Sequence, residues 1–360
     1  MFTLHRHTHA ASIHRIAFVL SILFIAPACN SLSYYGQAIG GHLSLMAGSE
    51  PLDEVMNDPD TSDELRQGLE LAQSIVAFAE QEMLLPGNGS YRHYVKVQGR
   101  YVVWNVVATP PYSIQARQWC YPFAGCVTYR GYFAEADARQ FAQTLQSQGM
   151  DIAVAGASAY STLGWLDDPL FSSMMYRDEA RLVEVIIHEL AHQRLYIPGD
   201  TVFNEGFASV VAREGVRRWF EKKKTPQEFK TFIQSQHMDK ALNRLLMVTR
   251  ERLEVLYTSD SSDEEKAAGK IRIFSWLQDE YVGLKSAGVL DGRFDSWMQG
   301  ALNNANLALV AAYHQLEPEL ELLLRQQDGD LESFYQLAEH YRDGEKPFVD
   351  GQLPENQMTK

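Results

Sequence analysis

The segment that most constrains the fold is 177–223, which contains two helical patterns separated by a very short break. Apolar residues recur every three or four positions in both RDEARLVEVIIHELAHQRLY and NEGFASVVAREGVRRWFEKK, which predicts two helices that each bury one face. Pro198 and Gly199 end the first helix. Because the connection is short, the two helices must pack side by side as an antiparallel hairpin.

The first of these segments carries two histidines around a glutamate. His188 and His192 are four residues apart, so a helix presents both imidazoles on one face, about 6 Å apart. Glu189 points about 100° round the helix and cannot easily share an ion with them. It can reach a water bound to that ion, which is the position of a general base in zinc hydrolysis. The pattern therefore indicates a catalytic metal helix.

A catalytic zinc ion needs a third protein ligand and one open position. Glu205 lies near the start of the second helix and supplies a carboxylate. Three small residues follow on its face and let the helices approach closely: Ala208, Ser209 and Ala212. The alternatives are a buried structural histidine pair and a closed structural zinc site. Structural zinc sites favour cysteine-rich ligand sets, so we expect one catalytic Zn²⁺ ion.

Upstream of the hairpin the sequence mixes helical and strand patterns. Residues 36–85 indicate helices, and Gln98-Gly99-Arg100 predicts a hairpin turn between two strands. Strands are expected over 91–97, 101–108, 126–133 and 151–157, with a helix over 135–149. Further helices are expected over 225–257, 261–288, 294–326 and 330–342, the first opened by a capping box from Thr225 to Glu228. The fold class is α+β: a small antiparallel sheet followed by a mainly helical region that carries the histidine pair.

The first 28 residues have the pattern of a signal peptide. Basic residues precede an apolar run over 16–26, which is too short to span a bilayer comfortably. Ala26-Pro27-Ala28 fits an ordinary cleavage site, whereas the small residue before Cys29 fits lipidation of that cysteine. We favour lipidation because Cys29 follows the apolar run at the right distance. We therefore expect a protein of the bacterial cell envelope, attached to a membrane through Cys29 and facing the periplasm.

Cysteine content and net charge agree with export and exclude one class of partner. If Cys29 carries lipid, Cys120 and Cys126 remain as an even pair that can form a disulfide; two buried thiols are the alternative. The formal net charge of −14 would repel phosphates, so we expect no nucleic-acid partner. No later segment is long and apolar enough for a transmembrane helix.

The chain resembles the gluzincin metallopeptidases, and more closely the bacterial putative aminopeptidase family of secreted or lipid-anchored proteins. The resemblance covers most of the chain after residue 28 and includes NGSYRHYV, VVWNVVATPP, WCYPFAGCVTYRGYF, AYSTLGWLDDPL and HELAHQRLYIPGDTVFNEGFA. It implies a zincin-like fold, His188, His192 and Glu205 as metal ligands and Glu189 as catalytic acid and base. Two features depart from the well-known gluzincins: the second histidine is only thirteen residues from the glutamate, and Ser209 replaces a supporting aspartate.

A peptidase of this kind also has to hold its substrate. In gluzincins an edge strand just before the metal helix does this, and 159–169 occupies that place in the chain; a surface loop is the alternative. The expected substrate contacts are Ser161, Gly164, Trp165 and Tyr313. The candidate acids for a free α-amine are Asp167, Asp168 and Glu135, and the candidate oxyanion donors are Tyr160, Tyr196 and Tyr313. Asn303, Asn304 and Asn306 are weaker candidates for the cleft.

Together these features predict a zinc-dependent peptidase in which Glu189 moves protons as general base and acid. Aminopeptidase activity follows from the family resemblance alone. A zinc endopeptidase of the cell envelope and a non-catalytic binding lipoprotein on a zincin scaffold are the alternatives. We expect residues 29–360 to form one domain, with helices and sheet over about 36–177, helices over 178–345 and a loose tail over 346–360.

Overall fold

The computed structural model describes residues 34–343, apart from 122–124, 164 and 176. It divides into two units, Met1–Ala47 and Gly48–Lys360. Within the first unit, residues 34–47 are helical. The predicted signal peptide, the lipidation site Cys29 and the expected loose tail lie outside the described residues. None of the described helices combines the length and the apolar character needed to cross a membrane.

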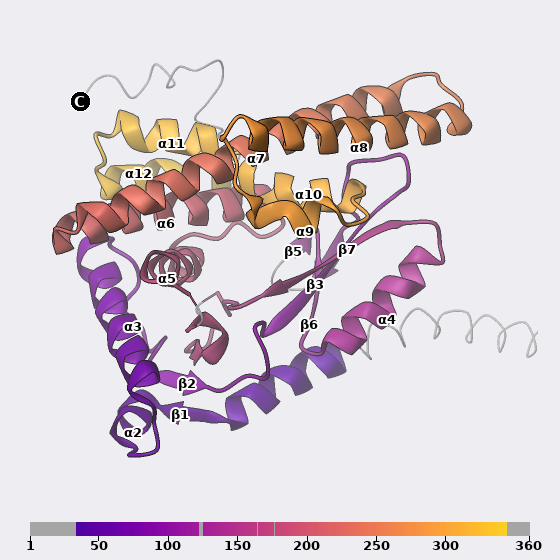
Figure 1. Cartoon of the computed structure of the whole chain (residues 1–360). Coiled ribbons are helices and arrows are strands. Elements are labelled where there is room, and N and C mark those ends of the chain that lie inside the picture. The colour runs from indigo at the N-terminus through magenta and orange to yellow at the C-terminus, as the bar shows by residue number, and fades with distance from the viewer. Residues whose placement is uncertain (1–33, 122–124, 164, 176, 344–360) are drawn as a thin grey trace, which may run out of the picture. The chain divides into compact units, whose positions relative to one another are not determined.

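The second unit contains eight short strands among its described residues, arranged in three small sheets (Figure 1). The first sheet has the order β1-β2-β8, from Ser49–Pro51, His93–Val95 and Leu170–Phe171. The second has the order β6-β3-β7, from Arg130–Tyr132, Val103–Thr109 and Asp151–Ala157. The third pairs β4 (Trp119–Tyr121) with β5 (Gly125–Val127). All pairs are antiparallel except β2 with β8, so the expected single antiparallel sheet is divided.

The predicted hairpin around Gly99 is wrong. β2 is occupied on one side by β1 and on the other by β8, while β3 lies between β6 and β7. Both strands therefore have other partners on both edges, and Gly99, at φ +86°, lies in the connection between two sheets. The prediction missed β1 because Ser49–Pro51 lies inside the segment expected to be helical. That short strand is what binds β2 in place of β3.

The second sheet is covered by one helix on each face. Val107 and Ala153 are opposite each other on β3 and β7 and pack against α10 (Asn304–His314). Val154, the next residue of β7, points to the other face, beside α4 (Glu135–Gln146). The strand expected over 151–157 and the helix expected over 135–149 are both confirmed.

Helices make up nearly all of the rest of the second unit. α2 (Leu52–Asn57) and α3 (Asp63–Glu82) lie between β1 and β2 in the chain. After β8 and the 3₁₀ turn η1 (Ser172–Met174), the chain forms α5 (Glu179–Arg194), α6 (Thr201–Lys223), α7 (Pro226–Thr258), α8 (Asp263–Ser286), η2 (Gly292–Phe294), α9 (Asp295–Met298), α10, α11 (Glu317–Gln326), α12 (Leu331–Glu339) and η3 (His340–Asp343). The α+β class, with strands followed by helices, is confirmed.

α6 is the central helix of this part, packed against α5, α7, α10 and α11. Its close approach to α5 depends on Gly215, where a Cβ would lie 2.3 Å from Cδ1 of Ile187. A larger residue at Gly215 would require the Ile187 side chain to shift. The predicted helical hairpin is therefore confirmed, because α5 and α6 pack directly against each other.

The two predicted helix starts after α6 differ in outcome. At α8, Ser262 and Glu265 form a capping box, and Ser262 has an extended backbone with φ −65° and ψ 163°. At α7, Thr225 has φ −112° and ψ 72° and makes no side-chain capping bond, so the box predicted with Glu228 is wrong. Pro226 still begins the helix, because a residue at that position needs no amide hydrogen bond.

Candidate metal centre

The metal helix α5 is fixed at its start and along one face. Asp178 caps it by accepting a hydrogen bond from the amide of Arg181 at 2.9 Å. Its inner face consists of fully or almost fully buried apolar residues: Leu182, Val183, Ile186, Ile187, Leu190 and Ala191. This burial sets the rotation of the helix, so His188 and His192 both face α6, with ring centroids 4.8 Å apart.

The turn into α6 is held by a side chain from the Asn-Glu pair itself. Asn204, 2% exposed, accepts a hydrogen bond from the amide of Ile197 and donates one to the carbonyl of the same residue, each at 2.8 Å. Asp200 caps α6 by accepting from the amide of Phe203 at 3.0 Å. The short spacing is therefore compatible with a metal site, because the turn folds α6 directly back so that Glu205 faces α5.

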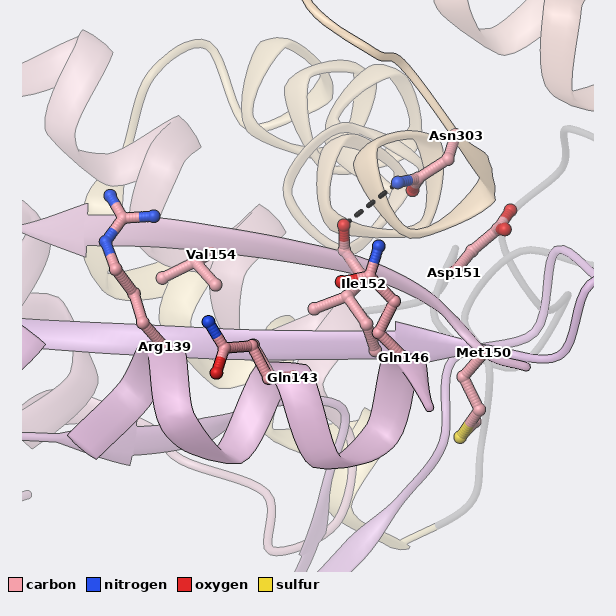
Figure 2. A pocket seen from close by; sticks show the side chains of 9 residues that line it. Arg139, Gln143, Gln146, Met150, Asp151, Ile152, Val154 and Asn303 are labelled. Atoms are coloured by element: carbon pink, nitrogen blue, oxygen red, sulfur yellow. Dashed lines mark hydrogen bonds between the residues drawn. The ribbon is translucent and has the colours of Figure 1, made fainter. Parts of the chain in front are cut away.

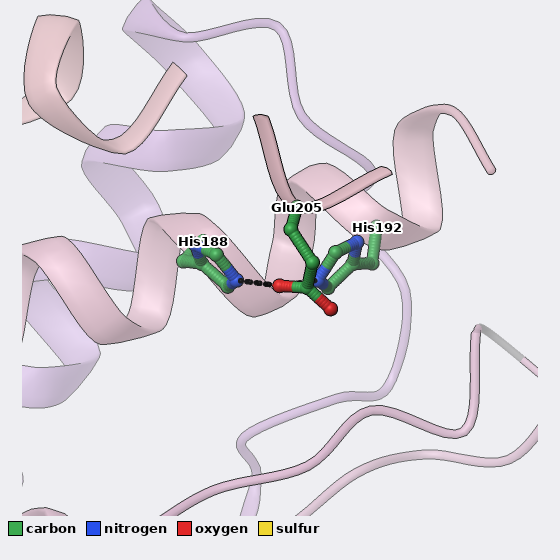
Figure 3. A group of neighbouring side chains, drawn as sticks. All are labelled: His188, His192 and Glu205. Atoms are coloured by element: carbon green, nitrogen blue, oxygen red, sulfur yellow. Dashed lines mark hydrogen bonds and ion pairs between the residues drawn. The ribbon is translucent and has the colours of Figure 1, made fainter. Parts of the chain in front are cut away.

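The structure brings the three expected ligands together (Figure 3). One carboxylate oxygen of Glu205 lies 3.3 Å from Nε2 of His188 and 3.8 Å from Nε2 of His192. One ligand atom from each residue lies within 4.8 Å of the other two. Two imidazole nitrogens and a carboxylate oxygen at this spacing can hold a metal ion.

Burial and mutual charge shift the pKa values of the three groups in different directions. Burial lowers the pKa of His192 to about 4, so its ring is neutral at pH 7. Burial also acts to lower the pKa of His188, but the hydrogen bond and charge of Glu205 outweigh it and raise that pKa overall. Burial opposes ionisation of Glu205, yet both histidines together lower its pKa. The site therefore offers a carboxylate to a neutral imidazole and to one that readily holds a positive charge.

Glu189 lies on the same helix, half-buried and next to the triad. Burial raises its pKa to about 7, with further upward contributions from the charges of Glu205 and Asp168 and a downward one from His188. A carboxylate of this pKa exchanges a proton readily near neutral pH, as a general base and acid must.

The three candidate tyrosines take different places. Tyr313, on α10, stacks on His188 with ring centroids 6.5 Å apart, and the charge of Glu205, followed by burial, raises its pKa well above the usual value. Tyr196 has its ring 6.5 Å from that of His192. Tyr160 instead stacks on Phe171, at 5.4 Å. Tyr313 and Tyr196 therefore adjoin the metal ligands.

The segment 159–169, expected to be an edge strand, contains no strand among its described residues; Gly164 lies outside them. It closes on Asp168: Oγ of Ser161 and the amide of Thr162 donate to that carboxylate, both at 3.0 Å. Trp165 is 70% exposed. The loop alternative describes this segment, which connects two edge strands, β7 before it and β8 after it.

Among the candidate acids and amides, only Asp168 adjoins the base. Asp168 is 2% exposed, and its charge acts on Glu189. Asp167 is exposed, and Glu135 is a partly exposed partner of Arg139. The candidate asparagines all act at or beside the start of α10, where Asn303 and Asn306 form its capping box and Asn304 bonds to Tyr257.

Several residues that the sequence analysis missed join Asp168 to the metal helix. Gln193 donates to Asp168 at 3.1 Å and accepts from Asn88 at 2.6 Å. The backbone carbonyl of Asp168 accepts from the amide of Tyr91 at 2.6 Å. Helix periodicity places Gln193 on the face of Glu189, four residues away, and could have identified it. No comparable signal identifies Tyr91.

A disulfide hairpin supports the turn between the metal helices. The structure joins Cys120 and Cys126, a cross-strand pair of β4 and β5, by a disulfide. Gly125 lies directly against the turn: a Cβ on it would be 2.5 Å from the amide nitrogen of Gly199. Gly125 also has φ +74°, which a side chain would strain. The hairpin and the turn therefore meet backbone to backbone.

A hollow of about 400 Å³ lies elsewhere, between α4 and β7 (Figure 2). It is lined by Arg139, Gln143, Val154 and Asn303, among others, and by none of the metal-site residues. Asn303 donates from its side chain to the carbonyl of Ile152 at this place. The hollow is therefore separate from the candidate centre.

Comparison with known families now adds to this geometry. A family model described as "Putative aminopeptidase" matches residues 33–348. The chain belongs to this family. The matched range includes α5, the turn after it and α6. No curated protein and no solved structure matches the chain. Membership in the family indicates a peptidase, which acts on peptides.

Proposed function

We propose that the protein is a zinc-dependent peptidase and that it removes residues from free amino termini. The observation that carries the proposal is the position of Glu205, whose carboxylate lies 3.3 Å and 3.8 Å from the two imidazoles, with Glu189 one residue from His188. The aminopeptidase activity is supported by the family description. Zinc is supported by the ligand set, because two histidines and one carboxylate are typical of catalytic zinc in peptidases.

Each residue around the ion would have a separate role. His188, His192 and Glu205 would hold zinc, which when bound supplies an activated water and polarises the scissile carbonyl. Glu189 accepts the proton of the attacking water and delivers it to the leaving amine. Tyr313, whose ring stacks on that of His188, would donate a hydrogen bond from its hydroxyl to the oxygen that becomes negative in the transition state.

We further propose that the chain is exported and attached to the membrane through a lipid on Cys29, facing the bacterial periplasm. The apolar run over 16–26 and the small residue before Cys29 support this. The Cys120–Cys126 disulfide agrees with an oxidising compartment. Labelling of the cells with a radioactive fatty acid, with and without Cys29→Ser, tests the anchor.

The test of the activity uses Glu189→Gln with His192→Ala as its counterpart. Zinc content is measured together with hydrolysis of aminoacyl substrates and of amino-terminally blocked peptides, with and without a chelator. Glu189→Gln should keep zinc and lose hydrolysis by at least a hundredfold, whereas His192→Ala should lose both. Cleavage of blocked peptides would indicate an endopeptidase. Loss of zinc in Glu189→Gln, or the lack of any chelator-sensitive hydrolysis, would refute the proposed roles.

A further inference from the structure

A buried hydroxyl without a hydrogen-bond partner lies on the Glu189 side of the site. Tyr91 is 3% exposed, and its Oη finds no partner among the described residues. Burial, and then the charges of Glu189 and of Asp168, raise the pKa of Tyr91 well above its usual value. Both carboxylates therefore act on this hydroxyl. Buried hydroxyls are almost always hydrogen-bonded, so the hydroxyl of Tyr91 has hydrogen-bonding capacity that a ligand group can use.

The backbone holds Tyr91 in an unfavourable conformation to keep it there. Its φ is +63°, in the left-handed region that a bulky side chain rarely adopts. The amide of Tyr91 is fixed by a 2.6 Å hydrogen bond to the carbonyl of Asp168. Strained residues of this kind concentrate where a side chain must be presented to a ligand.

The loop that carries Tyr91 is tied to the metal helix beside the base. Gln193 donates to Asp168 at 3.1 Å and to Oγ of Ser90 at 3.3 Å, and Asn88 donates to Gln193 at 2.6 Å. Gln193 is four residues after Glu189, so their side chains lie on one face about 6 Å apart. The loop that carries Tyr91 is thus joined by hydrogen bonds to the turn of α5 that follows Glu189.

The negative charge around the Tyr91 hydroxyl determines which kind of ligand can bind there. Asp168 is 2% exposed and accepts hydrogen bonds only from neutral donors: Ser161, Thr162 and Gln193. Among the described residues it has no ion-pair partner. The hydroxyl is therefore in the field of two carboxylates, Glu189 and Asp168, and among the described residues neither carboxylate forms an ion pair with a lysine or arginine. A cation that carries N–H donors fits this place, and an anion such as a peptide carboxyl terminus does not.

We propose that Tyr91 and Asp168 determine specificity by binding the free α-ammonium group of the substrate. The ammonium donates a hydrogen bond to Oη of Tyr91 and lies in the field of the Asp168 carboxylate. An α-nitrogen is only about 2.5 Å from the carbonyl carbon that is attacked, which matches a site next to Glu189. The ammonium of a lysine side chain lies several bonds further away. This inference rests on the proposed zinc peptidase function.

Binding of matched hydroxamates to the zinc-loaded full chain tests the proposal without relying on turnover. Leucine hydroxamate and 4-methylpentanoyl hydroxamate differ only by the α-amine, and both can coordinate zinc. Calorimetry at pH 7 should show tighter binding of the amine ligand to the wild-type protein. Tyr91→Phe should reduce that advantage about tenfold and leave the affinity of the amine-free ligand and the zinc content unchanged. Tyr101→Phe, at an exposed tyrosine, is the matched control.

A second variant and a third ligand separate the remaining outcomes. Asp168→Asn keeps the shape of the side chain and should also reduce the amine advantage. If the wild-type protein binds both hydroxamates equally, or if Tyr91→Phe weakens both equally, the amine site is refuted while the zinc centre stands. If 6-aminohexanoyl hydroxamate gains from Tyr91 instead, the site binds basic side chains and the proposal is wrong. If neither ligand binds, the zinc function itself fails and the amine site fails with it.

Discussion

Replacing Glu189 by Gln should make the metal-free protein more stable, although it removes the proposed base. Burial raises the pKa of Glu189 from 4.5 to about 7, because the folded protein holds its ionised form in a poorly solvated place. Glutamine has nearly the same shape and carries no charge. The substitution therefore removes an unfavourable buried charge and leaves the packing of α5 nearly unchanged.

The sign and size of this effect follow from the two pKa values. Folded Glu189 keeps its proton up to about pH 7, whereas the unfolded chain loses it near pH 4.5. Unfolding therefore releases a proton between these values, and the carboxylate lowers stability progressively as pH rises through that window. The full interval corresponds to about 3 kcal/mol, reached above pH 7. The stability difference between Glu189→Gln and wild type should be below about 1 kcal/mol at pH 5 and about 3 kcal/mol at pH 8.

Urea unfolding in the presence of a chelator, at pH 5 and at pH 8, measures the difference. Glu70→Gln, an exposed position on α3, is the control and should show no dependence on pH. Saturating zinc should shrink the pH 8 difference, since a nearby cation favours the carboxylate. A Glu189→Gln variant that is equally stable relative to wild type at both pH values would contradict the argument, because the carboxylate would then titrate alike in the folded and unfolded chains.

Three further substitutions test the parts that hold the metal helices together. Gly125→Ala should lower the free energy of unfolding by at least about 2 kcal/mol, because the added Cβ would meet the backbone at Gly199. Gly99→Ala, at a positive φ but in open space, should lower it by about 1 kcal/mol. Chemical denaturation of both variants measures the difference. Asn204→Ala should destabilise the protein by about 2 kcal/mol and weaken zinc binding in a competition assay, because it leaves the part-buried amide of Ile197 unpaired, whereas the carbonyl of Ile197 still accepts from the amide of Asp200. Replacing Cys120 and Cys126 by Ser should cost about 2 kcal/mol, and adding a reductant should lower the melting temperature of wild type but not of this variant.

The parts of the fold that could be predicted are those specified by local patterns. The helical hairpin follows from apolar periodicity and from Pro198-Gly199, and the strand at 151–157 follows from its β-branched and apolar composition. The partners of the strands could not be predicted in the same way. Ser49–Pro51 has no strand pattern, yet it pairs with β2 and so separates β2 from β3. A three-residue strand is specified by its partner, which local sequence does not contain.

The candidate site shows the same division between local and distant information. His188, Glu189 and His192 are related by helix geometry alone, and Glu205 by the short turn that follows. Tyr91, in contrast, reaches the site through a left-handed backbone and through bonds to residues 75 or more positions away. Hydrogen bonds between residues so far apart in the chain produce no periodic pattern in the sequence. The edge-strand role expected at 159–169 was therefore assigned to a segment that instead folds around Asp168.

Asp168 fixes two loops without regular structure, the 161–168 loop and the loop that carries Tyr91, next to α5. Its carboxylate joins the 161–168 loop to Gln193, and its backbone joins that loop to the segment that carries Tyr91. Gln193 follows His192 directly. A change in the position of these loops is therefore transmitted to the turn of α5 that contains His192. Asp168 thus lies in a position to connect recognition of a substrate's amine with the geometry of the ion. A variant at Asp168 should therefore change zinc affinity and amine selectivity together, while Tyr91→Phe changes selectivity alone.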